Sequence, residues 1–287
     1  MLDPMKRVHV FLHDAYGDWE LGYILPELIS KGVEVLTFGI SATAVRSAGS
    51  LQVTPTLAID QVDAGQMLIL PGGRFWSDLD DARLDQLVST LHDRSVPIAA
   101  ICAATGYLAR LSLLDSVAHT SNSIAFLRER APGYRGDLHY RNAAAVSDGK
   151  IITAGGLGAV DFTYEILREL GVGDPRVWYR AFKYGEEPGA TNQRFAILLS
   201  KIPGRETSPQ TIRRHIEHIR KLDDDGQLVL CGPFIDHPSG LVIVKAGDVA
   251  DATRIAMADP FVREGVRTFE VRTWLLGHRE NSYLGDP

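Results

Sequence analysis

Two cysteines are all that the 287 residues contain, so a framework of disulfides is excluded. Cys102 and Cys231 fall in different predicted domains, and we expect no bond between them. Such sparing use of cysteine suits a reducing, cytoplasmic location. Nine histidines occur, but no CxxC or HExxH spacing accompanies them, and we predict neither a metal nor an organic cofactor.

Long apolar runs are also missing: none approaches the ~20 residues that a membrane-spanning helix needs. Residues 1–12 have no extended apolar stretch before a small-residue cleavage site, and we expect a first β-strand there instead of a signal peptide. The formal charge is −6, whereas a nucleic-acid protein normally carries a basic face. Membranes and nucleic acids are therefore not expected partners, and a small-molecule substrate is.

The first part of the chain alternates short apolar strands with helical spacing. Repeated βα units of this kind predict an α/β domain with a flavodoxin-like parallel sheet sandwiched by helices. The expected strands are residues 8–12, 33–38, 67–70, 98–101 and 150–153; the expected helices are residues 21–30, 84–92, 104–114, 161–170 and 174–184. We place this domain in residues 1–185.

A polar segment rich in Gly and Pro, residues 186–192, is the predicted linker to a second domain in residues 193–278. The second domain shows the order βαββαβ, which is the ferredoxin-like α+β arrangement. Its expected strands are 195–200, 227–231, 241–245 and 268–275, and its expected helices are 209–222 and 249–257.

Cys102 lies where an apolar strand meets a helix. A nucleophile elbow is tight, and it needs small residues two positions before and two positions after the nucleophile. Ala100 and Ala104 meet that requirement. The start of the helix would direct its N–H groups at the sulfur and lower the pKa of the thiol. A buried cysteine that only packs remains the alternative on this evidence.

Two further segments lead to the same edge of the predicted sheet. The strand 67–70 ends in Pro71-Gly72-Gly73, whose exposed N–H groups, with that of Ala103, could form an oxyanion hole. An ordinary turn after the strand explains the glycines equally well. The loop after the first strand, residues 13–20, carries three acidic residues, although helix capping by Asp18 accounts for part of this pattern.

Four segments in this order resemble the ThiJ/PfpI superfamily, within the class I glutamine amidotransferase-like fold: DWELGYILPELISKGVEV, LILPGG, AAICAATGYLA and KIITAGGLGAVDFTYEIL. The resemblance implies that Glu20 hydrogen-bonds Cys102 and that Gly73 and Ala103 supply the oxyanion amides. It also implies a third catalytic residue in the segment 116–122, for which His119 is the candidate, with Thr120 at the family position. The elbow lacks the G-x-C-x-G of true amidotransferases, so glutaminase chemistry is not expected.

The second domain is similar to the YCII-related family, which implies a dimeric α/β-barrel type of assembly. The resemblance rests on RFAILLSK, GQLVLCGPF, LVIVKAGD and ADPFVREGV. It implies a dyad of His215 and Asp259, in which the carboxylate fixes the ring tautomer and leaves a nitrogen free as a base. His218, one turn along the helix, is the competitor for the role of His215. Cys231 is expected to be a packing residue within a strand.

These observations predict a cysteine-dependent enzyme, of hydrolase, hydratase or glyoxalase/deglycase type, that acts on a small electrophilic metabolite through Cys102 and Glu20. One alternative is a redox-sensing or stress-response protein whose Cys102 is oxidised without turnover. Another is that the YCII-related domain is the enzyme, an isomerase or lyase that uses His215 and Asp259. We expect a homodimer, because both families commonly use dimer contacts.

Overall fold

The computed structural model describes residues 6–63, 65–77, 79–185 and 193–277. The chain divides into two compact units, residues 1–188 and 189–287, each of which is described by itself below. The predicted linker, residues 186–192, lies outside the described residues, and the predicted domain limits stay predictions. No helix in the described part of the chain is both long and apolar enough to cross a membrane.

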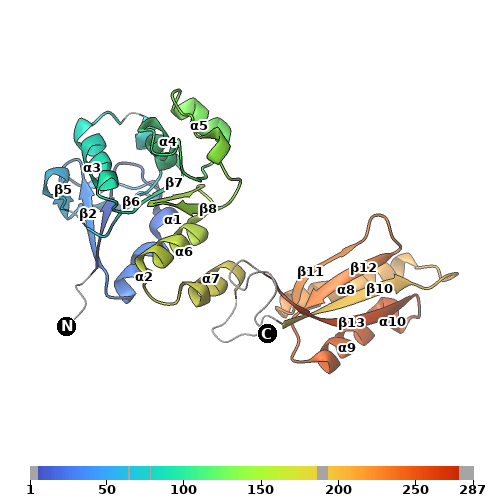
Figure 1. The fold of residues 1–287 in the computed structure, drawn as a ribbon. Coiled ribbons are helices and arrows are strands. Elements are labelled where there is room, and N and C mark those ends of the chain that lie inside the picture. The colour runs from blue at the N-terminus through green and yellow to red at the C-terminus, as the bar shows by residue number, and fades with distance from the viewer. Residues whose placement is uncertain (1–5, 64, 78, 186–192, 278–287) are drawn as a thin grey trace. The chain divides into compact units, whose positions relative to one another are not determined.

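A seven-stranded sheet forms the centre of the first unit (Figure 1). Neighbouring strands pair in parallel, except that β8 runs antiparallel to β9 at one edge. The sheet is thus mixed and mostly parallel, which confirms the predicted fold class. Across it the strands are β5 (Leu57–Ala58), β2 (Glu34–Gly39), β1 (Arg7–Phe11), β6 (Met67–Leu70), β7 (Ile98–Ile101), β9 (Ile151–Ala154) and β8 (Ala145–Asp148). A separate small ribbon pairs β3 (Val45–Arg46) with β4 (Gln52–Val53).

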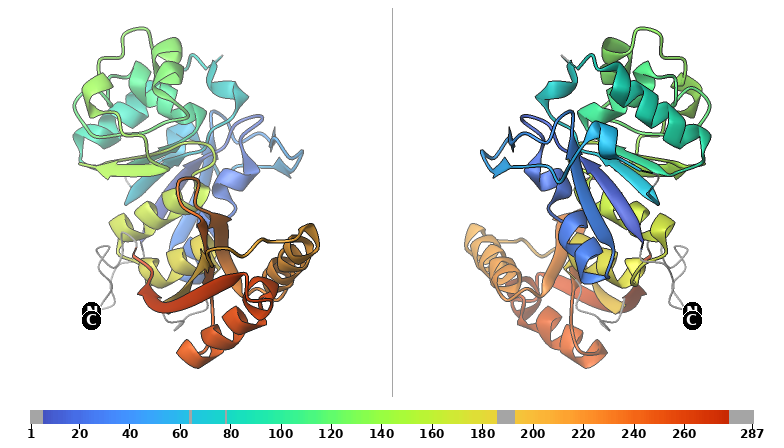
Figure 2. Two further views of the ribbon diagram at one scale, coloured as in Figure 1. Left: turned by 90° about the vertical axis from the view of Figure 1, so that its right-hand side faces the viewer. Right: turned by 90° about the vertical axis from the view of Figure 1, so that its left-hand side faces the viewer.

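Helices cover both faces of this sheet, as the views in Figures 1 and 2 show. Alternate residues of the buried strands point to opposite faces, so that Val8, Val10 and Ile101 pack in one core while Leu68, Leu70 and Ile98 pack in the other. The first core includes side chains of α1 (Asp18–Leu21), α2 (Ile24–Ser30), α6 (Ala159–Leu170) and α7 (Pro175–Tyr184). The second includes side chains of α3 (Ala82–Asp93), α4 (Ala103–Arg110) and α5 (Ile124–Arg130).

Most of the expected elements are present, and the differences have local causes. The helix expected at residues 21–30 is broken into α1 and α2, because Pro26 has no N–H to donate to the carbonyl of Gly22. The helix expected to reach residue 114 ends at Arg110, and Ser112 then takes a positive φ of 60°. Helix α5 and strand β8 were not predicted.

The second unit is a four-stranded antiparallel sheet with its helices packed into one core. In sequence numbering the strand order is second, third, first, fourth, which is the ferredoxin-like order that the sequence predicts. The strands are β11 (Leu228–Pro233), β12 (Ser239–Val244), β10 (Gln193–Lys201) and β13 (Arg267–Leu275); the helices are α8 (Pro209–Asp224), α9 (Val249–Ala258) and α10 (Pro260–Arg263). Phe195, Ile197 and Val244 form the centre of its core, together with Leu222 of α8 and Ala252 of α9.

Candidate active site

Cys102 occupies a sharp turn between β7 and α4. Its φ of 58° and ψ of −122° lie in a region that a side chain rarely adopts, as the strained elbow prediction requires. Ala100 and Ala104, the two small flanking residues, are fully buried. The turn is secured on both sides, since the Cys102 N–H donates to the Ala154 carbonyl (2.9 Å) and its carbonyl accepts from the hydroxyl of Thr105 (2.6 Å).

Glu20 approaches Cys102 from the loop and short helix after β1. Its side chain is 1% exposed, and Oε2 accepts a hydrogen bond from the N–H of Gly72 (2.5 Å). Glu20 and Cys102 each shift the pKa of the other group. The buried Oε1 atom has no hydrogen-bond partner among the described residues. The structure thus brings the Glu20 carboxyl close to Cys102, which is the neighbour that the family resemblance implies.

The glycine at position 72 makes this contact possible. A Cβ atom at Gly72 would lie 2.6 Å from Cys102 Cβ and 2.9 Å from both carboxylate oxygens of Glu20. Any larger residue would therefore push the two reactive side chains apart. Gly72, the first glycine after β6, therefore allows the side chains of Glu20 and Cys102 to lie close together.

The protonation of Glu20 and that of Cys102 depend on each other. Burial raises the pKa of the Glu20 carboxyl to about 7, against the stabilising hydrogen bonds from Gly72 and Cys102. Burial likewise raises the pKa of the Cys102 thiol, and the negative charge of Glu20 raises it further. The sequence-based expectation of a lowered thiol pKa is therefore wrong in direction while Glu20 is ionised. The negative charge of Glu20 thus opposes formation of the Cys102 thiolate, and the two groups titrate as a coupled pair.

Asn122 is the residue at this site that the sequence reasoning missed. Its Nδ2 lies 3.4 Å from Cys102 Sγ, and this contact lowers the pKa of the thiol, as does the hydrogen bond from the Ala103 N–H. The Asn122 oxygen accepts from the N–H of Gly156 (2.9 Å), which fixes the direction of the amide. The family pattern pointed to the segment 116–122, but nothing in the sequence distinguished its last residue.

His119 and Thr120, the two candidates for the third catalytic position, take part in the fold instead. The His119 ring is fully buried between the carbonyl of Val117 (2.8 Å) and the hydroxyl of Tyr134 (2.6 Å). Burial also lowers its pKa. Thr120 donates to the Ala143 carbonyl (2.8 Å). With both ring nitrogens engaged by these partners, His119 is not brought to Cys102.

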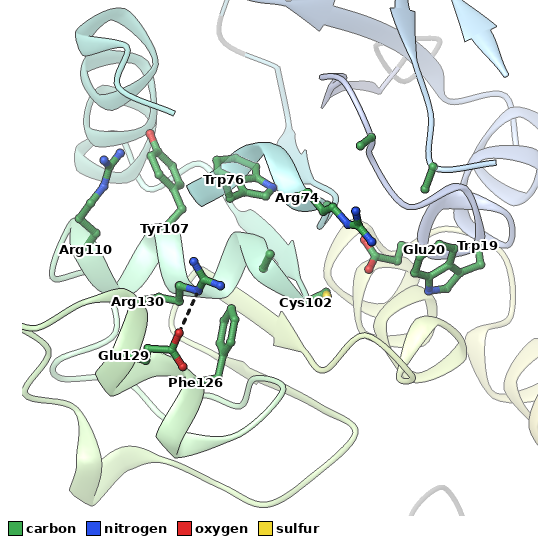
Figure 3. A pocket seen from close by; sticks show the side chains of 15 residues that line it. Trp19, Glu20, Arg74, Trp76, Cys102, Tyr107, Arg110, Phe126, Glu129 and Arg130 are labelled. Atoms are coloured by element: carbon green, nitrogen blue, oxygen red, sulfur yellow. Dashed lines mark ion pairs between the residues drawn. The ribbon is translucent and has the colours of Figure 1, made fainter. Parts of the chain in front are cut away.

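A cavity of about 770 Å³ opens beside Cys102 (Figure 3). Gly73 and Ala103, the two predicted oxyanion donors, both line it. The Ala103 N–H points at the sulfur, so a group that reacts with Cys102 would lie within its reach. The larger lining side chains are aromatic or charged: Trp19, Glu20, Arg74, Trp76, Tyr107, Arg110, Phe126, Glu129 and Arg130.

The second unit brings His215 and Asp259 together, as the family resemblance implies. His215 Nδ1 lies 2.9 and 3.0 Å from the two carboxylate oxygens of Asp259, which is 3% exposed. The ring stacks on Phe261 with centroids 3.9 Å apart. His215 lines a mostly apolar cavity of about 510 Å³, whereas the competing His218 lines a different one.

Cys231 departs from its expected role. It is exposed on β11, an edge strand of the second sheet, and lines the same cavity as His215. The prediction of a packing cysteine is therefore wrong. As for metals, the described residues contain no group of three or more His, Cys, Asp or Glu side chains placed to hold an ion.

A mostly parallel sheet, a cysteine in a strained elbow and a buried glutamate near the sulfur together define a class of α/β protein with a cysteine at a nucleophile elbow. Comparison with known proteins identifies the family. Residues 6–169 match the model of the DJ-1/PfpI family, and the chain belongs to that family. Residues 193–275 match the YCII-related domain, so the chain joins a DJ-1/PfpI domain to a YCII-related one.

The relatives cover the first domain in particular. The chain is 31% identical over 191 residues to "Uncharacterized protease YoaZ" of Bacillus subtilis, which is 62% of this chain and 91% of that protein. It is 30% identical over 173 residues to "Uncharacterized protease YdeA" of the same organism, covering 60% of this chain and 86% of that protein. Among solved structures, a DJ-1 superfamily protein from Agrobacterium tumefaciens is 36% identical with a TM-score of 0.59, over 63% of this chain and 98% of that one.

Proposed function

We propose that this protein is a cysteine-dependent enzyme, of hydrolase, hydratase or glyoxalase type, that acts on a small electrophilic molecule at Cys102. The observation that carries the proposal is the pairing of a strained cysteine with a buried carboxyl group at the edge of an open cavity. Strain and a perturbed, buried carboxyl are features of functional sites, since a fold gains nothing from either alone.

The proposed chemistry uses each group in turn. The sulfur of the Cys102 thiolate forms a bond to the electrophilic carbon, and the π pair of the carbonyl moves to oxygen. The Gly73 and Ala103 N–H groups stabilise this oxyanion, which then takes the proton of the Glu20 carboxyl. With an acyl substrate, the adduct expels a protonated leaving group, and water cleaves the remaining thioester to restore the thiol.

The names of the two Bacillus relatives favour a hydrolase, in which water is the second substrate. The lining of the cavity favours a small substrate over a peptide. No histidine is among the described residues that line it, and the amine of a cleaved peptide bond needs a strong proton donor. A carbonyl or similarly activated carbon requires only the proton that Glu20 can supply.

Turnover and adduct formation test this function. A panel of small aldehydes, dicarbonyls, isonitriles and activated esters should include a molecule that is converted by the wild-type chain and by Cys231→Ser but not by Cys102→Ser. Mass spectrometry of the chain during turnover should find the added mass on the peptide of Cys102. Conversion that survives in Cys102→Ser would overturn the proposal.

A second candidate function resides in the second unit and is supported by the His215–Asp259 geometry. The Asp259 carboxylate holds one ring nitrogen of His215, which leaves Nε2 as a base toward an apolar cavity. Proton abstraction from a small apolar metabolite, as in an isomerase or lyase, suits this arrangement. Loss of turnover in His215→Ala with retention in Cys102→Ser would favour this candidate over the first.

A further inference from the structure

The cavity at Cys102 is rich in arginine, in contrast to the acidic chain around it. The protein has a net charge of −6, yet Arg74, Arg110 and Arg130 all line this one cavity. Glu20 and Glu129 are the acidic side chains of the same lining. When Glu20 carries its proton, the lining residues hold three guanidinium charges against the one carboxylate charge of Glu129, so their excess charge is positive.

Arg130 is the arginine best placed to take up a ligand. In the described part of the chain, Arg130 forms one long ion pair, in which its Nε lies 3.9 Å from Oε1 of Glu129. The Glu129 side chain is 72% exposed. Exposed pairs of this kind contribute little binding energy. The guanidinium also lies over the ring of Phe126 at 5.7 Å, and in Figure 3 it extends from α5 into the space between Phe126 and Trp76. Stacking of this kind limits its motion and leaves its N–H edge available for an anion.

Close packing of α5 on α4 places Arg130 beside the helix that begins after Cys102. A Cβ atom at Gly106 would lie only 3.0 Å from Arg130 Cβ and 3.3 Å from the Phe126 ring. Gly106 is four residues beyond Cys102 along the helix, an axial distance of about 6 Å. The base of the Arg130 side chain thus packs against α4 about one helical turn from Cys102, and the side chain lines the same cavity.

Arg110 is held more firmly and contributes mainly its charge. It donates to the Leu79 carbonyl (3.1 Å) and to Asp85 (3.3 Å), and it lies 5.2 Å from the centroid of the Tyr107 ring. Its position at the far end of α4 places a second positive charge behind Arg130, on the same side of the cavity (Figure 3).

From this arrangement we propose that the substrate of the Cys102 site carries a carboxylate, which Arg130 binds while the electrophilic carbon faces the sulfur. This inference rests on the proposed function and narrows its substrate class. Because Arg130 and Cys102 line one cavity of about 770 Å³, the carboxylate and the reacting carbon must belong to one small molecule, such as a short oxo acid. The planar guanidinium can hold the carboxylate through two parallel hydrogen bonds and so orient the molecule.

Two alkylating reagents that differ in charge test the proposal without any knowledge of the substrate. Iodoacetate carries a carboxylate and iodoacetamide is its neutral counterpart, and both react with the thiolate. Their rates are measured in a Cys231→Ser background, so that Cys102 is the one cysteine left. The ratio of the two rates cancels any change in the fraction of thiolate. The matched control is Arg128→Gln, which lies on the same helix and pairs with Asp137 outside the cavity.

Arg130→Gln should lower the ratio of iodoacetate to iodoacetamide rates about fivefold, the effect of one partly screened charge. Arg128→Gln should leave it unchanged, and Arg110→Gln should lower it less than Arg130→Gln does. An unchanged ratio in Arg130→Gln, with Cys102 reacting normally with iodoacetamide, overturns the carboxylate inference alone. If Cys102 reacts with neither reagent, the proposed function fails and the inference fails with it.

Discussion

The side-chain amide of Asn122 lies 3.4 Å from the sulfur of Cys102 and donates toward it. Together with the Ala103 N–H, it opposes the effects of burial and of Glu20, which raise the thiol pKa. Asn122 thus lowers the pKa of the Cys102 thiol, whereas Glu20 raises it. We expect the reactivity of Cys102 to depend on the balance between these two effects.

Removal of the Asn122 amide should therefore raise the pKa of Cys102. In Asn122→Ala we expect alkylation at pH 7 to slow roughly tenfold, the effect of losing one hydrogen bond to a charged group. The measurement is the rate of alkylation against pH, with peptide mapping to separate the two cysteines. Asn142→Ala, an exposed asparagine elsewhere in the first unit, is the control and should behave as the wild type.

Substitutions of Glu20 should affect the alkylation of Cys102 and the turnover of substrate differently. In Glu20→Gln the charge that raises the thiol pKa is gone and an amide can still donate, so iodoacetamide should react at least as fast as in the wild type. Turnover, which needs a proton from position 20, should fall. Glu20→Asp keeps a negative charge near the sulfur, so its alkylation should stay slower than that of Glu20→Gln. Glu27→Gln serves as the control, and equal alkylation rates in Glu20→Gln and Glu20→Asp would contradict the prediction.

The buried carboxyl should also make stability depend on pH. The pKa of Glu20 is raised to about 7 in the folded state from 4.5, so its burial costs nothing below pH 4.5. As the pH rises from 4.5 through 7, the Glu20 carboxyl ionises in the unfolded state before it ionises in the folded state. Ionisation therefore favours unfolding, and the free energy of unfolding falls by up to about 3 kcal/mol. We expect the melting transition of the first unit to fall between pH 5 and pH 8, and to fall less in Glu20→Gln. Parallel curves for the two proteins would refute this.

Asp259 has two roles in the second unit that substitution can separate. Besides holding His215, its side chain caps α10 by accepting from the Phe261 N–H (2.8 Å). Asp259→Ala should destabilise the second unit by about 1 kcal/mol, whereas Asp259→Ser retains a cap and should cost less. Neither change, nor His215→Ala, should alter the alkylation of Cys102, since these residues belong to a different compact unit from Cys102. A marked slowing in any of the three would show that the two units share a site.

The predicted homodimer can be tested by light scattering at micromolar concentration. The second unit exposes large apolar side chains on the strands at both edges of its sheet, among them Leu230 (50%) and Trp274 (38%). A second copy would remove such surface from water. Leu230→Lys should shift the protein toward monomer, while Leu138→Lys, at a still more exposed leucine of the first unit, should not. A monomer of 31.5 kDa in the wild type would reject the prediction.

Local features of the sequence were sufficient for the elbow and its strands. Residues 67–70 and 98–101 are short apolar runs with clear ends, and both became strands with these limits. The small residues on either side of Cys102 predicted the turn because the geometry of an elbow depends on its immediate neighbours. The pairing of Glu20 with Cys102 required knowledge of the family, since 82 residues separate the two positions.

Contacts made over long distances in the chain were beyond prediction. Asn122 reaches the sulfur only because the N–H of Gly156, in the turn after β9, holds its oxygen. His119 is turned toward Tyr134, a partner that no local pattern indicates. Strand β8 has four residues and only one fully buried side chain, so it carries no apolar run to reveal it. The sequence predicts a lowered pKa for Cys102 because the start of a helix stabilises a thiolate. Burial of the thiol, which the sequence does not reveal, raises the pKa instead.

Main-chain segments at Gly72 and Gly156 lie against Cys102 on one side of the cavity. Side chains of the helices α4 and α5 form another part of its lining. A Cβ atom at Gly72 or Gly156 would come within 2.6 or 3.3 Å of Cys102 Cβ, so backbone segments after β6 and β9 shape the reactive half. The other half is formed by Tyr107, Phe126 and Arg130 on the outer helices α4 and α5. Single substitutions on those two helices can therefore change which molecules enter without disturbing the reactive pair.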